Sequence, residues 1–263
     1  MSARPRLVAT DLDGTLLRTD GTLSARTREA IAAAEGAGIP TLFVTARPPR
    51  WLDELADAVG GHGIAICGNG AFVYDVAARE VTASRGHDPV LMRAVIADLR
   101  AAVPGIAFAV ERADGMGAES HYVYAQEHSD GHVVGSLEEI STTAVGKLLA
   151  RSPGSDPEVF LQDVLAVVGD RVELGYSGAV GLAEMTAPGV TKASGLSAWC
   201  AGHGIDASEV WACGDMPNDL PMLGWVGRAY AVGNAHPDVL AAAHDVLPSN
   251  DDDGVAQLLE SLL

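Results

Sequence analysis

Short apolar runs that end in polar residues, with helical segments between them, constrain the fold of this chain most. Residues 7–9 lead to Asp11, residues 42–44 lead to Thr45, and residues 64–67 lead to Asn69. A helix with residues 51, 52, 55 and 59 on its apolar face is predicted between the second and third runs. Apolar strands separated by helices favour a parallel sheet covered on both faces. Because ligands bind outside the carboxyl ends of such strands, we expect Asp11, Thr45 and Asn69 at one edge.

The middle of the chain follows a different pattern. Predicted helices at 89–102 and 156–168 alternate with predicted strands at 106–110, 122–125, 147–150, 171–176 and 182–185. This order indicates a separate small α/β unit, a cap, at residues 83–186. After it, a helix that begins near residue 191 and strands at 209–213, 228–232 and 245–247 return to the first pattern. We therefore predict a doubly wound, Rossmann-like parallel-sheet core from residues 1–82 and 187–263, with the cap inserted.

Composition limits the possible classes of function. Hydrophobic residues make up 48% and charged residues 20%, which is typical of a packed interior. The formal net charge of -18 should repel nucleic acid and anionic membranes, so neither is expected as a partner. It should also repel a phosphate ester, so a phosphate site must supply its own positive charge. No signal peptide is expected, and no apolar run approaches the roughly 20 residues that cross a bilayer. A cytoplasmic protein is expected, and its oligomeric state stays open.

The three cysteines exclude two kinds of site. Cys67, Cys200 and Cys213 lie far apart, their number is odd, and there is no CxxC pair. Neither a disulfide framework nor a zinc ribbon is therefore indicated. Buried, reduced thiols are the expected state, because free cysteine behaves in proteins as a small hydrophobic residue.

Asp11 and Asp13 form the first chemical motif. They lie two residues apart just past a buried strand, and Gly14 lets the chain turn so that their carboxylates can converge. A carboxylate pair in a cleft needs a cation or a proton, and both suit phosphoryl transfer. Mg²⁺ bridges carboxylate and phosphate oxygens, one aspartate attacks phosphorus, and the other protonates the leaving alkoxide. An Asx turn, in which both aspartates only bind nearby amides, is the alternative that this pair leaves open.

The segment 214–219 forms the second motif. It follows another apolar strand and brings Asp215 and Asp219 to the same sheet edge. Hard oxygen ligands without histidine or cysteine clusters favour Mg²⁺ over zinc. Thr45 ends a strand, where its hydroxyl can bind a phosphoryl oxygen, and Lys192 begins a helix, where its ammonium can neutralise phosphate and carboxylates. Each feature alone is also compatible with a polar turn, an ordinary strand threonine or a solvated lysine.

Together these motifs resemble a known family. The order Asp11-x-Asp13-Gly14-Thr15, Thr45, Lys192, Gly214-Asp215-x-x-Asn218-Asp219 is similar to the haloacid dehalogenase superfamily of phosphatases, above all its Cof-type branch. The resemblance covers essentially the whole chain, including the cap-sized insertion. It implies a Mg²⁺-dependent phosphomonoester hydrolase that acts on a small phosphorylated metabolite, such as a sugar phosphate or a phosphorylated cofactor. The implied reaction passes through an aspartyl-phosphate.

The resemblance also implies roles for the catalytic and metal-binding residues. Asp11 is expected as nucleophile and metal ligand, and Asp13 as the general acid that lends its backbone carbonyl to the metal. Lys192 is expected to balance charge. Asp215 is expected to complete the metal shell, with Asp219 as a further metal residue.

Four further residues are expected to hold the substrate. Thr45 would bind the phosphoryl group, while Arg47, Asn69 and Asn218 would bind the substrate. The family's Thr-Gly-Arg reads Thr45-Ala46-Arg47 in this chain. Substrate choice is expected in the cap, where the candidates in or beside predicted strands are Glu111, Arg112, Glu119, His121 and Tyr122.

Two other functions stay open at this point. A phosphomutase or phosphotransferase would pass the phosphoryl group to a sugar hydroxyl, and a measurement of phosphate release would separate it from a hydrolase. A non-catalytic sensor of a phosphorylated metabolite would be expected to lack the nucleophile or the acid. Asp11 and Asp13 are both present, which disfavours the sensor.

Overall fold

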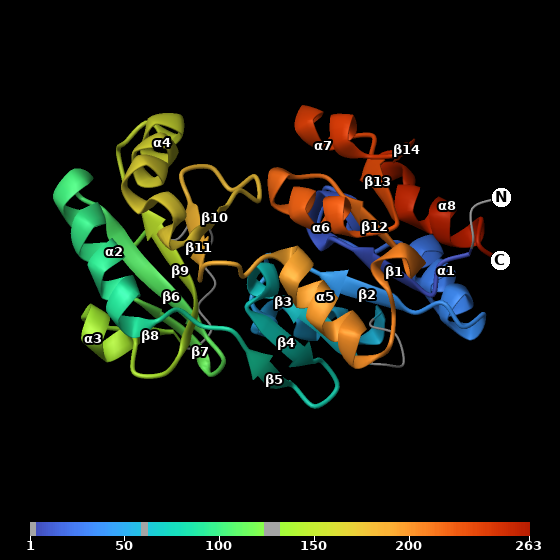
Figure 1. Ribbon diagram of the computed structural model, residues 1–263, viewed down its shortest axis with the longest axis horizontal. Helices are drawn as coiled ribbons and strands as arrows, with labels where there is room; N and C mark the ends of the chain where they lie inside the picture. Colours follow the sequence, from blue (N-terminus) through green and yellow to red (C-terminus); the bar gives the residue numbers. More distant parts are fainter. Residues whose placement is uncertain (1–3, 59–62, 124–131) are drawn as a thin grey trace. The chain divides into compact units, whose positions relative to one another are not determined.

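The computed structural model describes residues 4–58, 63–123 and 132–263, and the chain divides into two compact units (Figure 1). The first unit combines both ends of the chain, Met1–Ala83 and Thr191–Leu263, and the second is Ser84–Val190. The role of the second unit as a cap stays a prediction. Within the described ranges, no helix is both long and apolar enough to span a membrane.

An eight-stranded sheet in the order β14-β13-β12-β1-β2-β3-β4-β5 forms the centre of the first unit. Its parallel strands are β1 (Leu7–Thr10), β2 (Thr41–Val44), β3 (Ile64–Cys67), β12 (Val210–Gly214), β13 (Arg228–Val232) and β14 (Asp245–Leu247). β1 lies between β2 and β12, so the strand order reverses at β1. In open α/β sheets this reversal marks the edge where ligands bind.

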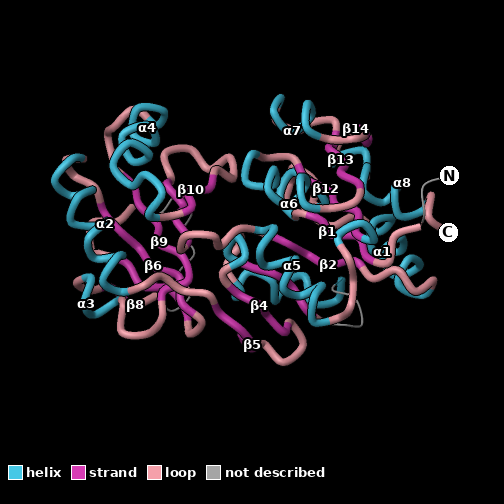
Figure 2. The backbone as a smooth tube through the Cα atoms, in the orientation of Figure 1, coloured by secondary structure: helices cyan, strands magenta, loops and turns pink. Residues whose placement is uncertain are grey.

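Helices flank this sheet (Figure 2). The helices are α1 (Ala25–Gly36), α5 (Lys192–Gly202), α6 (Leu220–Trp225), α7 (Pro237–Ala242) and α8 (Gly254–Glu260). α1 packs against α8, and α5 packs against α6. The units β1–α1–β2 and β12–α6–β13 run in opposite directions along the sheet. Right-handed crossovers therefore put α1 and α6, each with its packing partner, on opposite faces of the sheet. The predicted doubly wound α/β core is confirmed. At the start of α1, the side chain of Ser24 accepts a hydrogen bond from the Thr27 amide and caps the helix.

Two strands that the sequence analysis did not predict extend the sheet. β4 (Phe72–Asp75) pairs antiparallel with β3, and β5 (Glu80–Ser84) forms the outer edge. The sheet is therefore mixed rather than purely parallel. β5 is largely exposed, so it lacks the apolar run that makes the inner strands recognisable from sequence.

The helix predicted around residues 51–59 has a different geometry. It is a 3₁₀-helix, η2 (Pro49–Ala58), not an α-helix. Leu52 and Leu55 are buried, and their spacing of three residues matches the three residues per turn of a 3₁₀-helix. Val59 lies outside the described residues. The remaining short helical turns are η1 (Leu12–Leu16), η3 (Gly68–Gly70), η4 (Gly169–Arg171), η5 (Ala207–Glu209), η6 (Pro217–Asp219) and η7 (Asn250–Asp252).

The second unit has a six-stranded sheet in the order β10-β11-β9-β6-β7-β8. Its strands are β6 (Ala107–Arg112), β7 (Gly115–Ala118), β8 (Val133–Val134), β9 (Val145–Arg151), β10 (Glu173–Gly175) and β11 (Ala183–Thr186). Its helices are α2 (Pro89–Ala102), α3 (Leu137–Ile140) and α4 (Pro157–Val168). Asp88 and Asp156 cap α2 and α4, each followed by a proline in the first turn, and both predicted helices are confirmed.

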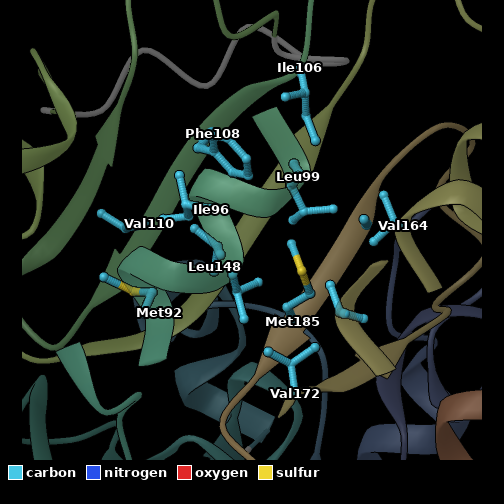
Figure 3. Packing of buried hydrophobic residues seen from close by; sticks show 14 of the residues in the cluster. Met92, Ile96, Leu99, Ile106, Phe108, Val110, Leu148, Val164, Val172 and Met185 are labelled. Carbon is cyan, nitrogen blue, oxygen red and sulfur yellow. The ribbon is translucent and has the colours of Figure 1, made fainter. Parts of the chain in front are cut away.

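The core of the second unit lies between its helices and one face of its sheet (Figure 3). Residues 92, 96 and 99 recur at helical spacing on α2 and meet alternating residues of β6, which is the pattern that buries one face of each element. The cluster includes Met92, Ile96 and Leu99 of α2, Val164 of α4, Phe108 and Val110 of β6, Leu148 of β9 and Met185 of β11.

The strand predicted at residues 122–125 is wrong in its described part. Tyr122 and Val123 are not in a strand, and residues 124–125 lie outside the described residues. β7 pairs antiparallel with β6 instead. Its sequence, Gly-Met-Gly-Ala, carries two glycines, which are depleted in strands and gave no strand signal.

Glycine allows a close backbone contact between α5 and η3. A Cβ built on Gly195 of α5 would lie 2.8 Å from Cγ2 of Ile66 and 3.0 Å from Cα of Gly70. A Cβ on Gly70 would lie 2.1 Å from the Thr191 carbonyl oxygen. The start of α5 and the end of β3 are thus held together by backbone contact that any side chain would disturb.

We predict that Gly195→Ala lowers the free energy of unfolding by about 1–3 kcal/mol, because the added methyl group overpacks this contact. The control is Gly202→Ala at the end of the same helix, where no atom lies within 4 Å of the new Cβ. The control should be as stable as the parent or up to about 1 kcal/mol more stable. Denaturant unfolding of both variants measures the difference, and equal stabilities would contradict the packing account.

Candidate active site

Three strand ends of the first unit carry the residues predicted to act together. Asp11 follows β1, Thr45 follows β2, and Asp215 follows β12. β1 pairs with both neighbours in parallel, so the three strands end at the same edge of the sheet. All three side chains are buried, with exposed fractions of 5%, 0% and 6%. They lie where the sheet topology places a ligand site.

A buried lysine connects two of the predicted aspartates. Nζ of Lys192 lies 2.7 Å from Oδ1 of Asp11 and 2.7 Å from Oδ1 of Asp219. Burial alone would lower the pKa of Lys192, but the charges of the two aspartates outweigh it and hold that pKa above its ordinary value. Lys192 is therefore a permanent ammonium that joins the first turn of α5 to two loops.

Asp219 organises the loop after β12. Its Oδ2 accepts hydrogen bonds from the backbone amides of Asp215 and Met216, both at 3.0 Å, while its Oδ1 binds Lys192. The side chain is fully buried. A Cβ built on Gly214 would lie 2.6 Å from Cβ of Asp219, so a glycine is needed for this loop to close.

Asp215 is held by the loop that follows β1. Its Oδ1 accepts a hydrogen bond from Oγ1 of Thr15 at 2.7 Å. Gly14 has a φ of 76°, and a Cβ at this position would lie 2.3 Å from Oδ2 of Asp215. Burial, followed by the charge of Asp219, raises the pKa of Asp215 to about 6. Burial also raises the pKa of Asp11 well above its ordinary value, against the opposing charge of Lys192.

Two asparagines that the sequence analysis missed brace the turn after Asp11. Nδ2 of Asn234 donates to the Gly14 carbonyl at 2.8 Å, and Oδ1 of Asn234 accepts from the Asn250 amide at 3.0 Å. Nδ2 of the buried Asn250 donates to the Leu17 carbonyl at 2.9 Å. Gly233-Asn234, directly after the strand β13, was the available signal, because it is another polar turn at the same end of a parallel strand.

Arg47 links Thr45 to the predicted general acid. The amide of Arg47 donates to Oγ1 of Thr45 at 3.0 Å. Its guanidinium forms two parallel hydrogen bonds with Asp13, from Nε to Oδ2 at 2.7 Å and from Nη2 to Oδ1 at 2.6 Å. Ala46 is not among the non-glycine residues with positive φ in the described ranges, so its methyl group causes no backbone strain at this turn.

Asn69 and Asn218, both predicted to bind substrate, contact each other. Nδ2 of Asn218 donates to Oδ1 of Asn69 at 3.1 Å. The Asn69 amide donates to the Thr45 carbonyl at 3.0 Å, so this pair lies between the end of β2 and the turn η6. The predicted site residues of the first unit thus form two sets of contacts, one around Lys192 and one around Thr45 and Arg47. The two sets meet in the chain where Asn218 precedes Asp219.

The carboxylates fit a divalent cation. Asp11, Asp215 and Asp219 each offer an oxygen, and these atoms lie within 4.8 Å of one another. Three buried carboxylates face one ammonium, and burial raises the pKa values of Asp11 and Asp215. A cation bound there would stabilise their ionised forms. Oxygen donors without histidine or cysteine suit Mg²⁺ in particular.

The substrate-selecting candidates of the second unit have partners within that unit. Glu119 pairs with Arg100 and accepts a hydrogen bond from the Phe108 amide at 2.9 Å. Arg112 donates from Nε to Oδ1 of Asp114 at 2.7 Å. These contacts explain both charged side chains structurally, and their part in substrate choice stays a prediction. The other candidates are Glu111 and Tyr122, which are buried, and His121, which is exposed.

Comparisons with known proteins agree with this geometry. The chain is 29% identical to pyridoxal phosphate phosphatase YbhA of Escherichia coli, over 98% of each chain. It is 28% identical to 5-amino-6-(5-phospho-D-ribitylamino)uracil phosphatase YitU of Bacillus subtilis, over 99% of this chain and 98% of that one. A solved haloacid dehalogenase-like hydrolase from B. subtilis has the same fold, with a TM-score of 0.84 and 22% identity over 98% of this chain and 100% of that chain.

The family itself is shown by a match along the sequence. The model of the haloacid dehalogenase-like hydrolase family matches residues 8–259. This range includes every predicted catalytic, substrate-binding and metal-binding residue. The predicted resemblance and the prediction of a hydrolytic enzyme are confirmed. The chain belongs to the haloacid dehalogenase-like hydrolases.

Proposed function

We propose that this protein is a Mg²⁺-dependent phosphatase that hydrolyses a small phosphorylated metabolite through a phosphoryl group carried on Asp11. One observation supports this most directly. The buried carboxylate of Asp11 lies at the switch point of the sheet, 2.7 Å from the ammonium of Lys192 and grouped with Asp215 and Asp219. This arrangement combines a nucleophile with the ammonium of Lys192 and with carboxylates that would hold Mg²⁺. The two cations together would supply the positive charge that a phosphate ester needs in a chain whose net charge repels it.

The reaction would proceed in two steps. A carboxylate oxygen of Asp11 attacks phosphorus, the bond from phosphorus to the ester oxygen breaks, and the leaving alkoxide takes a proton from Asp13. A water molecule then attacks the aspartyl-phosphate, gives its proton to Asp13, and frees inorganic phosphate and Asp11. Arg47 binds both oxygens of Asp13, so it must give up at least one of these bonds for Asp13 to act.

The other residues would hold charge and orientation. Lys192 would neutralise Asp11 and the phosphoryl group, and Thr45 would bind a phosphoryl oxygen. Mg²⁺ would be held by Asp11, Asp215 and the backbone carbonyl of Asp13, with Asp219 supporting the site through the Asp215 amide and Lys192. When bound, the cation would supply electrostatic stabilisation of the charge on the transferring phosphoryl group.

The names of the relatives support a proposal for the substrate class. Two relatives that align over nearly the whole chain are named for pyridoxal phosphate and for a phosphorylated ribitylaminouracil, both of which are small phosphate esters. A phosphorylated cofactor, cofactor precursor or sugar is therefore the proposed class. The second unit, residues 84–190, is proposed as the cap that selects among such esters, as the sequence predicts. A cytoplasmic location stays a prediction from the sequence.

We predict that Asp11→Asn abolishes Mg²⁺-dependent phosphate release, with a fall of at least about 1,000-fold, because an amide cannot attack phosphorus or carry the phosphoryl group. The control is Asp163→Asn, the same change at an exposed position of α4. Phosphate release from a panel of phosphorylated cofactors and sugars, with and without Mg²⁺, measures the effect. Equal loss in both variants, or release that survives in Asp11→Asn, would contradict the assignment of the nucleophile.

Lys192→Met should destabilise the protein by about 3–5 kcal/mol, because it leaves Asp11 and Asp219 as buried charges without their shared cation. Mg²⁺ should recover part of this loss. It should stabilise the variant more than the parent protein, because without Lys192 the metal ion alone neutralises the carboxylates. Denaturant unfolding at several Mg²⁺ concentrations measures both effects. A variant as stable as the parent without Mg²⁺ would show that Lys192 is not needed for charge balance.

The acid role of Asp13 makes a prediction about leaving groups. In Asp13→Asn, kcat/KM for alkyl phosphates should fall by about 100- to 10,000-fold, because the alkoxide no longer receives a proton. For p-nitrophenyl phosphate the fall should be much smaller, since nitrophenolate leaves without one. Arg47→Met removes the partner of Asp13 but keeps the acid, so it should not discriminate between leaving groups. An equal fall for both substrates in Asp13→Asn would refute the assignment.

A further inference from the structure

Asn69 has an unusual backbone conformation. Its φ of 57° and ψ of 32° lie in the left-handed region, and the residue is only 6% exposed. Two other non-glycine residues in the described ranges, Arg79 and Asp253, have a positive φ. Asparagine tolerates this region better than most residues, but glycine would occupy it with less strain. Because glycine would be less strained here, the Asn69 side chain is expected to have a function besides forming the turn.

The backbone around Asn69 is fixed on two sides. Its amide donates to the Thr45 carbonyl at 3.0 Å, and the Gly68 amide donates to the Arg47 carbonyl at 2.9 Å. On the other side, Gly70 lies against the Thr191 carbonyl at the start of α5. The turn is thus clamped between the loop after β2 and the helix that carries Lys192. The direction of the Asn69 side chain is set by this clamp.

The Asn69 side chain is used to orient another side chain. Its Oδ1 accepts the hydrogen bond that Nδ2 of Asn218 donates at 3.1 Å. Asn218 precedes Asp219, whose carboxylate binds Lys192 and the Asp215 amide, so the backbone of Asn218 is fixed as well. One N–H of the Asn218 amide is thus engaged by Asn69, and the acceptor Oδ1 is the atom of this amide that still needs a donor.

That oxygen is unmatched in the part of the chain that the structure describes. Oδ1 of Asn218 is buried, with no hydrogen-bond partner among the described residues. A buried acceptor without a donor is costly, and such atoms in native proteins usually meet a water molecule or a ligand. A phosphate ester that has lost both protons offers only acceptor oxygens, because its second pKa is about 6. A phosphoryl group therefore does not satisfy this atom near neutral pH, and a hydroxyl or N–H group does.

We propose that Asn69 is a positioning residue that presents Oδ1 of Asn218 as an acceptor for a hydrogen-bond donor on the non-phosphate part of the substrate. This inference rests on the proposed phosphatase function and narrows its substrate class. The preferred substrates are phosphate esters that carry a hydroxyl or N–H group near the ester oxygen. Esters of the same length without such a donor leave the buried oxygen unpaired and react more slowly.

The test compares two esters with the same three-carbon chain, glycerol phosphate, which carries hydroxyl groups, and propyl phosphate, which does not. The wild-type protein should prefer glycerol phosphate in kcat/KM by between about fivefold and about 100-fold, the range expected when a buried acceptor gains or loses its donor. Asn218→Leu, similar in shape but without polar atoms, should bring this ratio close to one.

Variants of Asn69 separate positioning from simple structure. Asn69→Asp keeps an acceptor for Nδ2 of Asn218 and should retain the preference. Asn69→Gly keeps the left-handed backbone and removes the acceptor, so it should lose most of the preference while its melting temperature stays equal or rises. Asn69→Ala lacks both features, and its melting temperature should fall below that of Asn69→Gly.

The outcomes distinguish this inference from the proposed function. If the wild type hydrolyses esters but Asn218→Leu keeps the wild-type ratio, the acceptor role is wrong while the phosphatase function stands. If Asn69→Gly keeps the ratio, Asn69 does not position Asn218. If the wild type releases no phosphate from any ester, including p-nitrophenyl phosphate, the proposed function fails and this inference fails with it.

Discussion

The buried ammonium of Lys192 is the interaction on which the arrangement of the site depends. It lies 2.7 Å from both Asp11 and Asp219, and it is the cation against which these aspartates and Asp215 can be buried together. Removing charges from water is costly unless they are paired and hydrogen-bonded, so the two loops after β1 and β12 must converge on the start of α5 for the lysine to be stable. Their convergence in turn creates the excess of negative charge that suits a divalent cation. Charge balance thus connects the folding of the first unit with its proposed chemistry.

Backbone contacts make this convergence possible. Gly14 allows the turn after β1 to approach Asp215 more closely than any side chain would permit, and Gly214 does the same for Asp219. Gly70 and Gly195 bring the end of β3 against the start of α5, which carries the lysine. Because these glycines let the loop backbones approach each other closely, the positions of the loops set the distances between the carboxylates. Close backbone contacts of this kind favour the preorganised charges that electrostatic stabilisation of a transition state requires.

The sequence predicts the part of the site that follows from parallel strands. Asp11 and Asp215 are recognisable because each follows an apolar run, and all such runs end at one edge. Asn234 also follows an apolar strand, β13, so its place at this edge could have been predicted. Its contact with the Gly14 carbonyl could not, because it joins residues 220 positions apart and depends on the packed loops. For the same reason the role of Asn69 changes from a direct substrate contact, as predicted, to a proposed positioning residue. In the fold, β7 is not predicted from the sequence because its two glycines are typical of a turn.

The most direct test of the account is to look for the phosphoryl group on the protein. The purified protein would be mixed with Mg²⁺ and p-nitrophenyl phosphate, quenched in acid within milliseconds, digested and analysed by mass spectrometry. The account predicts a phosphorylated peptide that contains Asp11, appears as nitrophenolate is released and decays as the substrate is consumed. Turnover without any phosphorylated peptide, or with the phosphoryl group on another residue, would contradict the central claim that Asp11 is the nucleophile.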